Sequence, residues 1–158
     1  MLFISWLGNH GGLWIALALL LLCRARTRRL GLTVALSLLL EAVCCNLLLK
    51  PSVGRIRPYA LNPDISLLLP PPADYSFPSG HTSAAFAFAA ALVGRRSRWG
   101  FVFCLFAVLM GFSRLYLYVH YPTDVLGGMI LGCLAGWFSC RLGDYLWPEP
   151  ARQIAEKC

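Results

Sequence analysis

Six polar residues have types that suit the chemistry of phosphate, and they occur in three separate stretches of the chain. They are Lys50, Arg57, His81, Arg114, His120 and Asp124. Arginine makes bidentate contacts with phosphate oxygens, and lysine supplies a point charge. A histidine oriented by a carboxylate is suited to act as a nucleophile or a base. If the fold brings the three stretches together, they form a site that binds and attacks phosphate.

The sequence Pro-Ser-Gly-His at 78–81 adds two residues to this predicted site. Ser79 follows Pro78 and is a suitable helix N-cap. The N–H groups from Gly80 onward then have no intrahelical acceptor and form an anion site aided by the helix dipole. Gly80 has no side chain, so a phosphate can approach the backbone closely. We therefore predict that Ser79 and Gly80 bind phosphate.

The two histidines suit a two-step phosphoryl transfer. Asp124 lies four residues after His120 and can turn back to the imidazole, which fixes the tautomer and raises the basicity of the other ring nitrogen. We expect His120 to attack phosphorus and form a phosphohistidine. His81 then protonates the leaving oxygen and later acts as the base for water.

Charge on the transferred phosphoryl group is expected to be held by the protein itself. Lys50, Arg57 and Arg114 would hold the equatorial oxygens as charge spreads over them in the transition state. We therefore expect neither a metal ion nor a cofactor.

These residues lie among five apolar segments. The chain is 58% hydrophobic, compared with about 45–50% in soluble domains. A bilayer core of about 30 Å needs about 20 helical residues, so one segment, 79–94, is short. The sequence predicts a single domain, 1–158, that is all-α and forms a polytopic transmembrane helical bundle of about five spans. The spans are 2–23 (interrupted at 8–12), 30–49, 79–94, 99–118 and 122–142.

Basic residues are distributed unevenly between the two predicted sides. Four arginines at 24–29, three at 95–98 and three basic residues at 141–157 fall on one side. The other four of the fourteen are Lys50, Arg55, Arg57 and Arg114. The positive-inside rule puts the richer side in the cytoplasm, with the N-terminus outside, the C-terminus inside and the site on the outer face of the plasma membrane. The net charge of +7 is then assigned to membrane flanks rather than to nucleic acid.

Several polar residues in or near the second span have weaker predictions. Glu41 lies nine residues from Lys50, about 900° around a helix, so we expect the two to face opposite sides. A structural hydrogen bond or a protonated acid is the expected role of Glu41. Asn46 lies on nearly the same face as Lys50 and is a better candidate for a supporting contact. Arg55 has two open alternatives, a second phosphate or contact with headgroups and solvent.

The seven cysteines do not form a CxxC pair or a zinc pattern. We expect them to be small buried hydrophobic residues.

The three stretches resemble the motifs of the type 2 phosphatidic acid phosphatase (PAP2) family, whose site also resembles that of vanadate haloperoxidases. The family pattern is K-x6-RP, PSGH and SR-x5-H-x3-D. The chain has KPSVGRIRP at 50–58, PSGH at 78–81 and SRLYLYVHYPTD at 113–124. Many members have six spans and a longer N-terminus, whereas five spans are predicted for this chain.

The resemblance implies a transmembrane bundle with metal-independent lipid phosphatase activity. It gives the role of nucleophile to His120, of its partner to Asp124 and of the acid to His81. It gives phosphate binding to the remaining residues, Lys50, Arg57, Ser79, Gly80 and Arg114. Small bacterial members are similar to undecaprenyl pyrophosphate phosphatases, which recycle the cell-wall lipid carrier on the outer face.

The lipid substrate has several alternatives at this point. A polyprenyl diphosphate is the leading one, and phosphatidylglycerophosphate, phosphatidic acid and lipid A are the others. The width of the pocket and the loop at 59–77 would decide between them. An anion transporter or a binding protein is disfavoured, because the polar residues lie at one edge, no internal repeat is present and the His/Asp set is complete.

Overall fold

The computed structural model describes residues 1, 11–62 and 64–146, and within these residues it contains helices and no strand. The predicted all-α class is confirmed. Five apolar helices form the bundle, together with shorter helical segments at 25–27, 43–53 and 58–61. The five are α2 (Gly12–Cys23), α3 (Arg28–Ala42), α6 (Gly80–Gly94), α7 (Gly100–Tyr116) and α8 (Pro122–Leu146).

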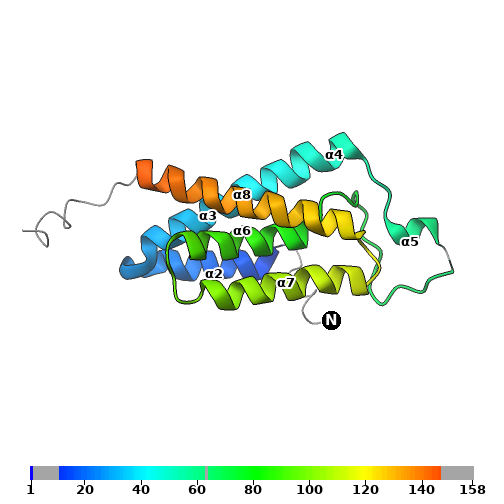
Figure 1. Cartoon of the computed structure of the whole chain (residues 1–158), viewed down its shortest axis with the longest axis horizontal. Helices are drawn as coiled ribbons and strands as arrows, with labels where there is room; N and C mark the ends of the chain where they lie inside the picture. Colours follow the sequence, from blue (N-terminus) through cyan, green and yellow to red (C-terminus); the bar gives the residue numbers. More distant parts are fainter. Residues whose placement is uncertain (2–10, 63, 147–158) are drawn as a thin grey trace, which may run out of the picture.

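Helix α6 lies between α3, α7 and α8; it runs antiparallel to α3 and α7 and parallel to α8 (Figure 1). Alanines at every second or third position of α6 are buried, and glycines of α8 face them. A Cβ atom at Gly128 would lie 2.6 Å from the Ser79 carbonyl oxygen, so only glycine allows the two helices to approach this closely. This contact brings the start of α6 against the start of α8.

The outside of the bundle is apolar, as expected for a protein in lipid. Two helical stretches, 25–61 and Pro122–Leu146, are long and apolar enough to cross a bilayer, whereas α2, α6 and α7 are shorter. Large hydrophobic side chains such as Leu47 and Phe101 are exposed. Of the six cysteines in the described residues, only Cys45 and Cys140 are buried. The prediction that the cysteines are buried is therefore wrong for most of them, because apolar runs in this chain also cover its outer surface.

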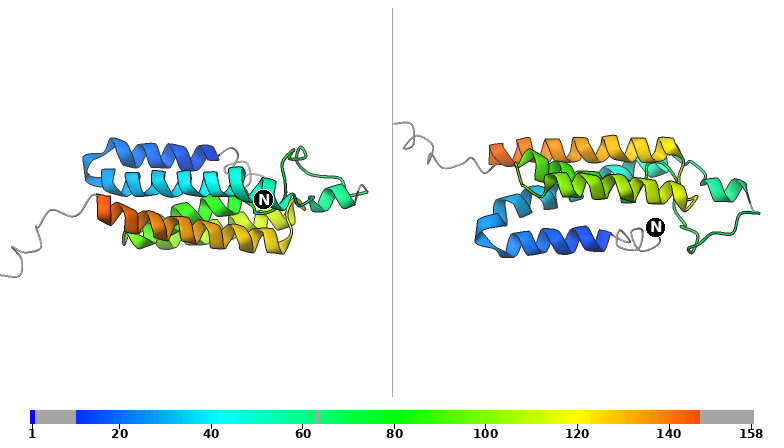
Figure 2. Two further views of the ribbon diagram at one scale, coloured as in Figure 1. Left: turned by 90° about the horizontal axis from the view of Figure 1, so that it is seen from above. Right: turned by 60° about the horizontal axis from the view of Figure 1, so that its bottom comes forward.

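The basic residues lie at two opposite ends of the bundle, as the spans predict. The end at which α3 and α7 finish and α6 and α8 begin is called the site end here, and it holds Lys50, Arg55, Arg57 and Arg114 (Figure 1). The opposite end holds the basic residues at 24–29, 95–98 and 141. The segment between Val53 and α6 extends past the site end and includes α5 (Pro58–Leu61) (Figure 2). The start of the first predicted span and the C-terminal Arg152 and Lys157 lie outside the described residues.

The second predicted span is not a regular α-helix along its whole length. After α3 the chain forms a π-helical segment, η3 (Val43–Leu49), and returns to α-helix in α4 (Lys50–Val53). A π-helix is bonded from i to i+5, so each residue turns by less than the 100° of an α-helix. This shortfall rotates Lys50 toward Glu41, and both residues line one cavity. The prediction that they face opposite sides is therefore wrong, because it assumed a regular α-helix.

Candidate active site

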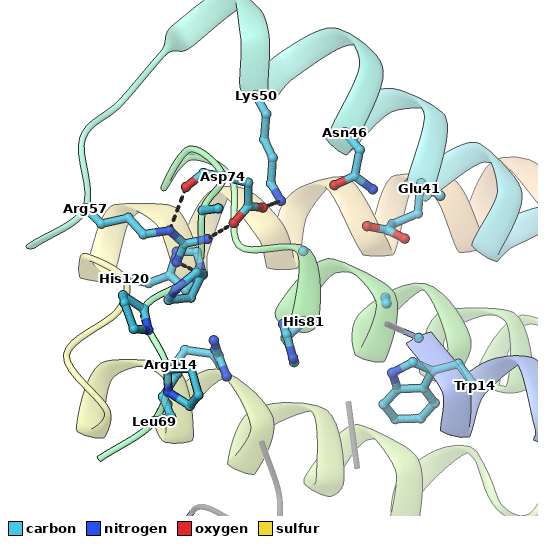
Figure 3. Close-up of a pocket in the computed structure, with 18 of the residues that line it drawn as sticks. Trp14, Glu41, Asn46, Lys50, Arg57, Leu69, Asp74, His81, Arg114 and His120 are labelled. Atoms are coloured by element: carbon cyan, nitrogen blue, oxygen red, sulfur yellow. Dashed lines mark hydrogen bonds and ion pairs between the residues drawn. The ribbon is translucent and has the colours of Figure 1, made fainter. Parts of the chain in front are cut away.

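A cavity of about 1000 Å³ lies at the site end and collects residues from all three sequence stretches. Its wall includes the segment 68–74 and parts of α2 and α3. Figure 3 shows that the side chains of His81, Arg114 and His120 lie near the contacts made by Lys50 and Arg57. Of the eight predicted site residues, six line this cavity. They are Lys50, Arg57, Gly80, His81, Arg114 and His120.

Arg57 makes hydrogen bonds with all three nitrogens of its guanidinium. Its Nε donates to the Asp74 carbonyl oxygen at 2.8 Å. One terminal nitrogen contacts the Val119 carbonyl at 2.9 Å and His120 Nε2 at 3.2 Å. The other contacts Asp74 Oδ1 at 2.6 Å and the Tyr75 carbonyl at 3.4 Å. The residue is buried, so these contacts fix its guanidinium between the loop before α6 and the loop before α8.

Lys50 approaches the same place from the π-helical side of the bundle. Its ammonium group pairs with Asp74 Oδ2. A Cβ atom at Gly80 would lie 3.6 Å from Lys50 Nζ, so the ammonium group lies over the first residue of α6. The positive charge of Lys50 therefore adds to the positive potential at the N-terminal end of the α6 dipole.

The contact with Arg57 defines the tautomer of His120. An arginine can only donate, so His120 Nε2 must accept and carries no proton. The proton of the neutral ring is then on Nδ1, which lies 3.5 Å from Asp124 Oδ2. This separation is long for a hydrogen bond, and no closer partner for Nδ1 is present among the described residues. Contacts of this kind commonly tighten when substrate binds.

Electrostatics keep the His120 ring neutral. Burial lowers the pKa of His120 to about 4, and the charges of Arg57 and Arg114 act in the same direction. The Asp124 carboxylate opposes this effect without reversing it. The unprotonated Nε2, which is the form that can attack phosphorus, therefore predominates at neutral pH.

Asp124 is fully buried in the first turn of α8, and its carboxylate is held by three groups besides His120. Ser76 Oγ donates to Oδ2 at 2.5 Å and the Tyr121 N–H at 2.9 Å. Arg55 donates to Oδ1 at 2.9 Å, and its guanidinium lies 4.1 Å from the centre of the Tyr121 ring. Arg55 also donates to Thr123. Arg55 thus turns toward Asp124, a contact that neither sequence alternative included.

The start of α6 is held against α8. Ser79 takes the N-cap position, but its hydroxyl contacts Thr82 Oγ1 at 2.9 Å and does not cap the helix. Its N–H donates to the Asp124 carbonyl at 3.0 Å. Ser79 is fully buried and is not among the residues that line the cavity. Phosphate binding by Ser79 stays a prediction, whereas Gly80 and His81 do line the cavity.

The inner wall of the cavity holds Glu41 and Asn46 (Figure 3). Glu41 is buried and accepts a hydrogen bond from Ser83 on α6, which confirms its expected structural hydrogen bond. Among the described residues, no group of three or more His, Cys, Asp or Glu is placed to hold a metal ion.

Two residues of the site, Asp74 and Ser76, were not predicted from the sequence. Both lie in the loop before the Pro-Ser-Gly-His stretch, where no periodicity or motif spacing indicates a direction for their side chains. The charge balance is the one available signal. Four cations lie on the site side of the chain, and cations in a membrane protein need partners. Asp74 is one such partner.

Comparison with known proteins agrees with this geometry. The family model of the PAP2 superfamily matches residues 27–148. An undecaprenyl-diphosphatase from Sulfolobus acidocaldarius is 34% identical over 90% of this chain and 68% of its own length. The undecaprenyl-diphosphatase BcrC from Bacillus subtilis is 38% identical over 58% of this chain and 47% of its own length. The chain thus spans 68% of the first of these relatives and 47% of the second.

Two solved structures share the fold. LpxE from Aquifex aeolicus is 30% identical with a TM-score of 0.76, over 88% of this chain and 82% of that one. A transmembrane PAP2-type phosphatidylglycerolphosphate phosphatase from Bacillus subtilis is 27% identical with a TM-score of 0.72, over 94% of this chain and 77% of that one. The expectation of a transmembrane bundle is confirmed by these neighbours. The motifs, the bundle and the family match together place the chain in the PAP2 superfamily, to which it belongs.

Proposed function

We propose that this PAP2 phosphatase hydrolyses the terminal phosphate of a polyprenyl diphosphate such as undecaprenyl diphosphate, through a phosphohistidine at His120. One observation carries the proposal. His120 presents an unprotonated Nε2 beside a cavity that is lined by three buried cations, Lys50, Arg57 and Arg114. A nucleophile among cations suits an anionic electrophile.

The charge balance supports a multiply charged ligand. Four cations gather at the site end, and in the described residues two carboxylates, Asp74 and Asp124, pair with them. Counted against these two ion-paired carboxylates alone, the four cations are in excess by two positive charges. A phosphate group with charge about −1.5 to −2 at neutral pH matches that surplus.

In the first proposed step, His120 Nε2 attacks the terminal phosphorus and the bond from phosphorus to the bridging oxygen breaks. The lipid monophosphate leaves with a proton from His81. In the second step, water attacks the same phosphorus, His81 takes a proton from the water and the phosphorus–nitrogen bond breaks. Inorganic phosphate leaves, and His120 is neutral again. Arg57 and Arg114 hold the equatorial oxygens through both steps.

Apolar residues support a lipid as the carrier of this phosphate. The cavity continues from the cations to Ile15, Leu38 and the segment 68–73, which contains two leucines and three prolines. A water-soluble phosphate ester would gain nothing from such a wall, whereas an isoprenoid or acyl chain is stabilised by leaving water. The name of the relative from Sulfolobus acidocaldarius favours a polyprenyl diphosphate.

The position of the basic residues supports a site on the outer face of the plasma membrane. In the described residues, eight arginines lie at the opposite end and four basic residues at the site end. The positive-inside rule then places the opposite end in the cytoplasm.

A second substrate class has support as well. A lipid A 4'-phosphatase from Bacteroides thetaiotaomicron is 36% identical over 66% of this chain and 49% of its own length. One of the two structural neighbours is a phosphatidylglycerolphosphate phosphatase. A phosphatase of either lipid would use the same cations and histidines.

The test measures phosphate release by the purified protein in detergent with EDTA, from C55 isoprenyl diphosphate, phosphatidylglycerophosphate, phosphatidic acid and lipid A. We expect the diphosphate to be hydrolysed with the highest kcat/KM, and the His120→Ala variant to release no phosphate. A higher kcat/KM for another lipid would keep the mechanism and replace the substrate. A folded wild-type protein that hydrolyses none of them would contradict the proposal.

A further inference from the structure

The Asp74 side chain bridges two of the phosphate-site cations (Figure 3). Its Oδ1 accepts from Arg57 at 2.6 Å, and its Oδ2 pairs with Lys50. A carboxylate with one oxygen on each cation has the charge and the contacts that two oxygens of a phosphate would have. Asp74 therefore occupies the place at which Lys50 and Arg57 would hold a substrate.

Arg57 has no donor to spare for a phosphate while this contact is made. A guanidinium has five N–H donors, and the contacts of Arg57 with Asp74, Tyr75, Val119 and His120 use all of them. Three of these contacts go to backbone carbonyls. A phosphate that binds Arg57 must therefore displace one of these contacts, and those made to side chains are the Asp74 carboxylate and His120 Nε2.

The Asp74 carboxylate is the contact that can be given up without moving the loop. Its side chain is 49% exposed, compared with 11% for Lys50 and 5% for Arg57. The backbone around it is fixed separately, because Tyr59 donates to the Pro72 carbonyl and Arg57 to the Asp74 carbonyl. A change of rotamer is enough to move the carboxylate into solvent.

The carboxylate is charged throughout the working range of pH. Burial raises the pKa of the Asp74 carboxyl, but Lys50 and Arg57 outweigh burial and lower the pKa to about 2. Competition between Asp74 and an incoming anion therefore persists at neutral pH.

We propose that the Asp74 carboxylate is a built-in competitor of phosphate for Lys50 and Arg57. The inference rests on the proposed phosphatase function. A free phosphate ion must displace the carboxylate with its own contacts alone, so it binds weakly. A lipid phosphate gains additional free energy from its chain in the apolar part of the cavity. Because Asp74 lowers the affinity for every phosphate, inorganic phosphate can leave after hydrolysis, whereas a lipid phosphate still binds through its chain.

The test compares full-length wild type, Asp74→Asn and Asp64→Asn in detergent. The asparagine at 74 keeps the shape of the side chain and removes its charge. Asp64 lies exposed in the same loop and has no ion pair among those of the described residues, so Asp64→Asn is a matched control for the loss of one negative charge. Binding of inorganic phosphate is measured as the rise in unfolding temperature with phosphate concentration, and separately as inhibition of lipid hydrolysis.

We expect Asp74→Asn to bind inorganic phosphate about tenfold more tightly than wild type, since a charged side chain no longer competes for Lys50 and Arg57. Asp64→Asn should match the wild type. Without phosphate, Asp74→Asn should unfold at a lower temperature, because two buried cations lose their carboxylate. Phosphate should restore more stability to it than to the wild type.

Unchanged or weaker phosphate binding by Asp74→Asn would overturn the inference, and weaker binding would show instead that Asp74 positions the cations. The Asp74→Glu variant keeps the charge and should retain weak phosphate binding. Suppose that the wild type hydrolyses lipid phosphate, and that inorganic phosphate raises the unfolding temperature of wild type and of Asp74→Asn equally. Only this inference then fails. If wild type neither hydrolyses lipid phosphate nor responds to inorganic phosphate, the proposed function fails with it.

Discussion

The two ends of α6 each hold an arginine that pairs with an aspartate, but their surroundings differ. At the opposite end, Arg95 pairs with Asp144 and donates to Thr33 Oγ1 at 3.0 Å and to the Cys140 carbonyl at 3.2 Å. The other described arginines of that end are exposed. At the site end, Lys50, Arg57 and Arg114 are buried around a cavity.

This difference separates a structural ion pair from a binding site. The contacts of Arg95 join α3, α6 and α8, and its one charge has one carboxylate. At the site end, three buried cations exceed the two carboxylates that form ion pairs there, Asp74 and Asp124, which is costly in a membrane unless an anion arrives. Arginine by itself therefore does not mark the site. The mark is a buried surplus of positive charge beside an unprotonated histidine.

The largest expected effect comes from the nucleophile at the site end. His120→Asn should lower kcat for phosphate release by about 10⁴-fold or more, because no other group replaces the attacking nitrogen. Its unfolding temperature should stay close to that of wild type. Residual activity above one hundredth of the wild-type rate would mean that water attacks directly and that His120 has a different role.

The matched pair Arg57→Gln and Arg95→Gln tests the comparison most sharply. Arg57→Gln should lower kcat/KM by about 10²–10³-fold, since it removes a donor to the charge that develops on phosphate. Arg95→Gln should leave kcat/KM within threefold and lower the free energy of unfolding by about 1 kcal/mol. An equal loss of activity in both variants would contradict the distinction between a binding site at the site end and a structural ion pair at the opposite end.

A smaller effect is expected at Arg55, which holds Asp124 from the side away from His120. Arg55→Gln should lower kcat about tenfold, because Asp124 loses one of its anchors. The positive charge of Arg55 opposes protonation of His120, so its removal should raise the His120 pKa from about 4. The acid limb of the pH profile should therefore move to higher pH in the variant.

The wild type and the Arg55→Gln variant act on the same substrate. The titration of the substrate therefore contributes equally to both pH profiles and cancels when they are compared. An acid limb that does not move would show that Arg55 has no electrostatic effect on His120, and one that moves to lower pH would contradict the expected sign of that effect. Rescue of kcat by Arg55→Lys would support a role through charge.

The smallest effect is expected on the inner wall of the cavity. Glu41→Gln keeps an oxygen that accepts from Ser83, so kcat/KM should stay within threefold. Glu41→Ala loses that bond and should lower the free energy of unfolding by about 1–2 kcal/mol. A hundredfold loss of activity in Glu41→Gln would place Glu41 within the catalytic machinery and extend the site along the cavity.

The bundle and the meeting of the three motifs were predictable because they depend on local patterns. The five apolar runs set the helices. The alternation of helix direction then brings Lys50, the start of α6 and the start of α8 to one end. His120 and Asp124 are four residues apart, so their proximity in space follows from one turn of the chain.

Other parts of the site depend on features that the local sequence does not express. Asp74 and Ser76 reach the cavity through the path of an irregular loop. The π-helical segment changes the face of Lys50, and its presence is not indicated by residue type. Arg55 contacts Asp124 across a separation of 69 residues, so its partner follows from packing rather than from spacing.

The most direct measurement of the central claim is capture of the phosphorylated enzyme. With a diphosphate substrate the leaving group is a lipid monophosphate, which needs less protonation than an alkoxide, so His81→Asn should still form the intermediate and hydrolyse it slowly. Substrate labelled with ³²P at the terminal phosphorus is mixed with His81→Asn and quenched. We expect about one label for each chain, stable to alkali and released by acid, and none in the double variant His81→Asn/His120→Ala. Label that persists without His120, or turnover of the diphosphate by His81→Asn with no label at any time, would contradict the account.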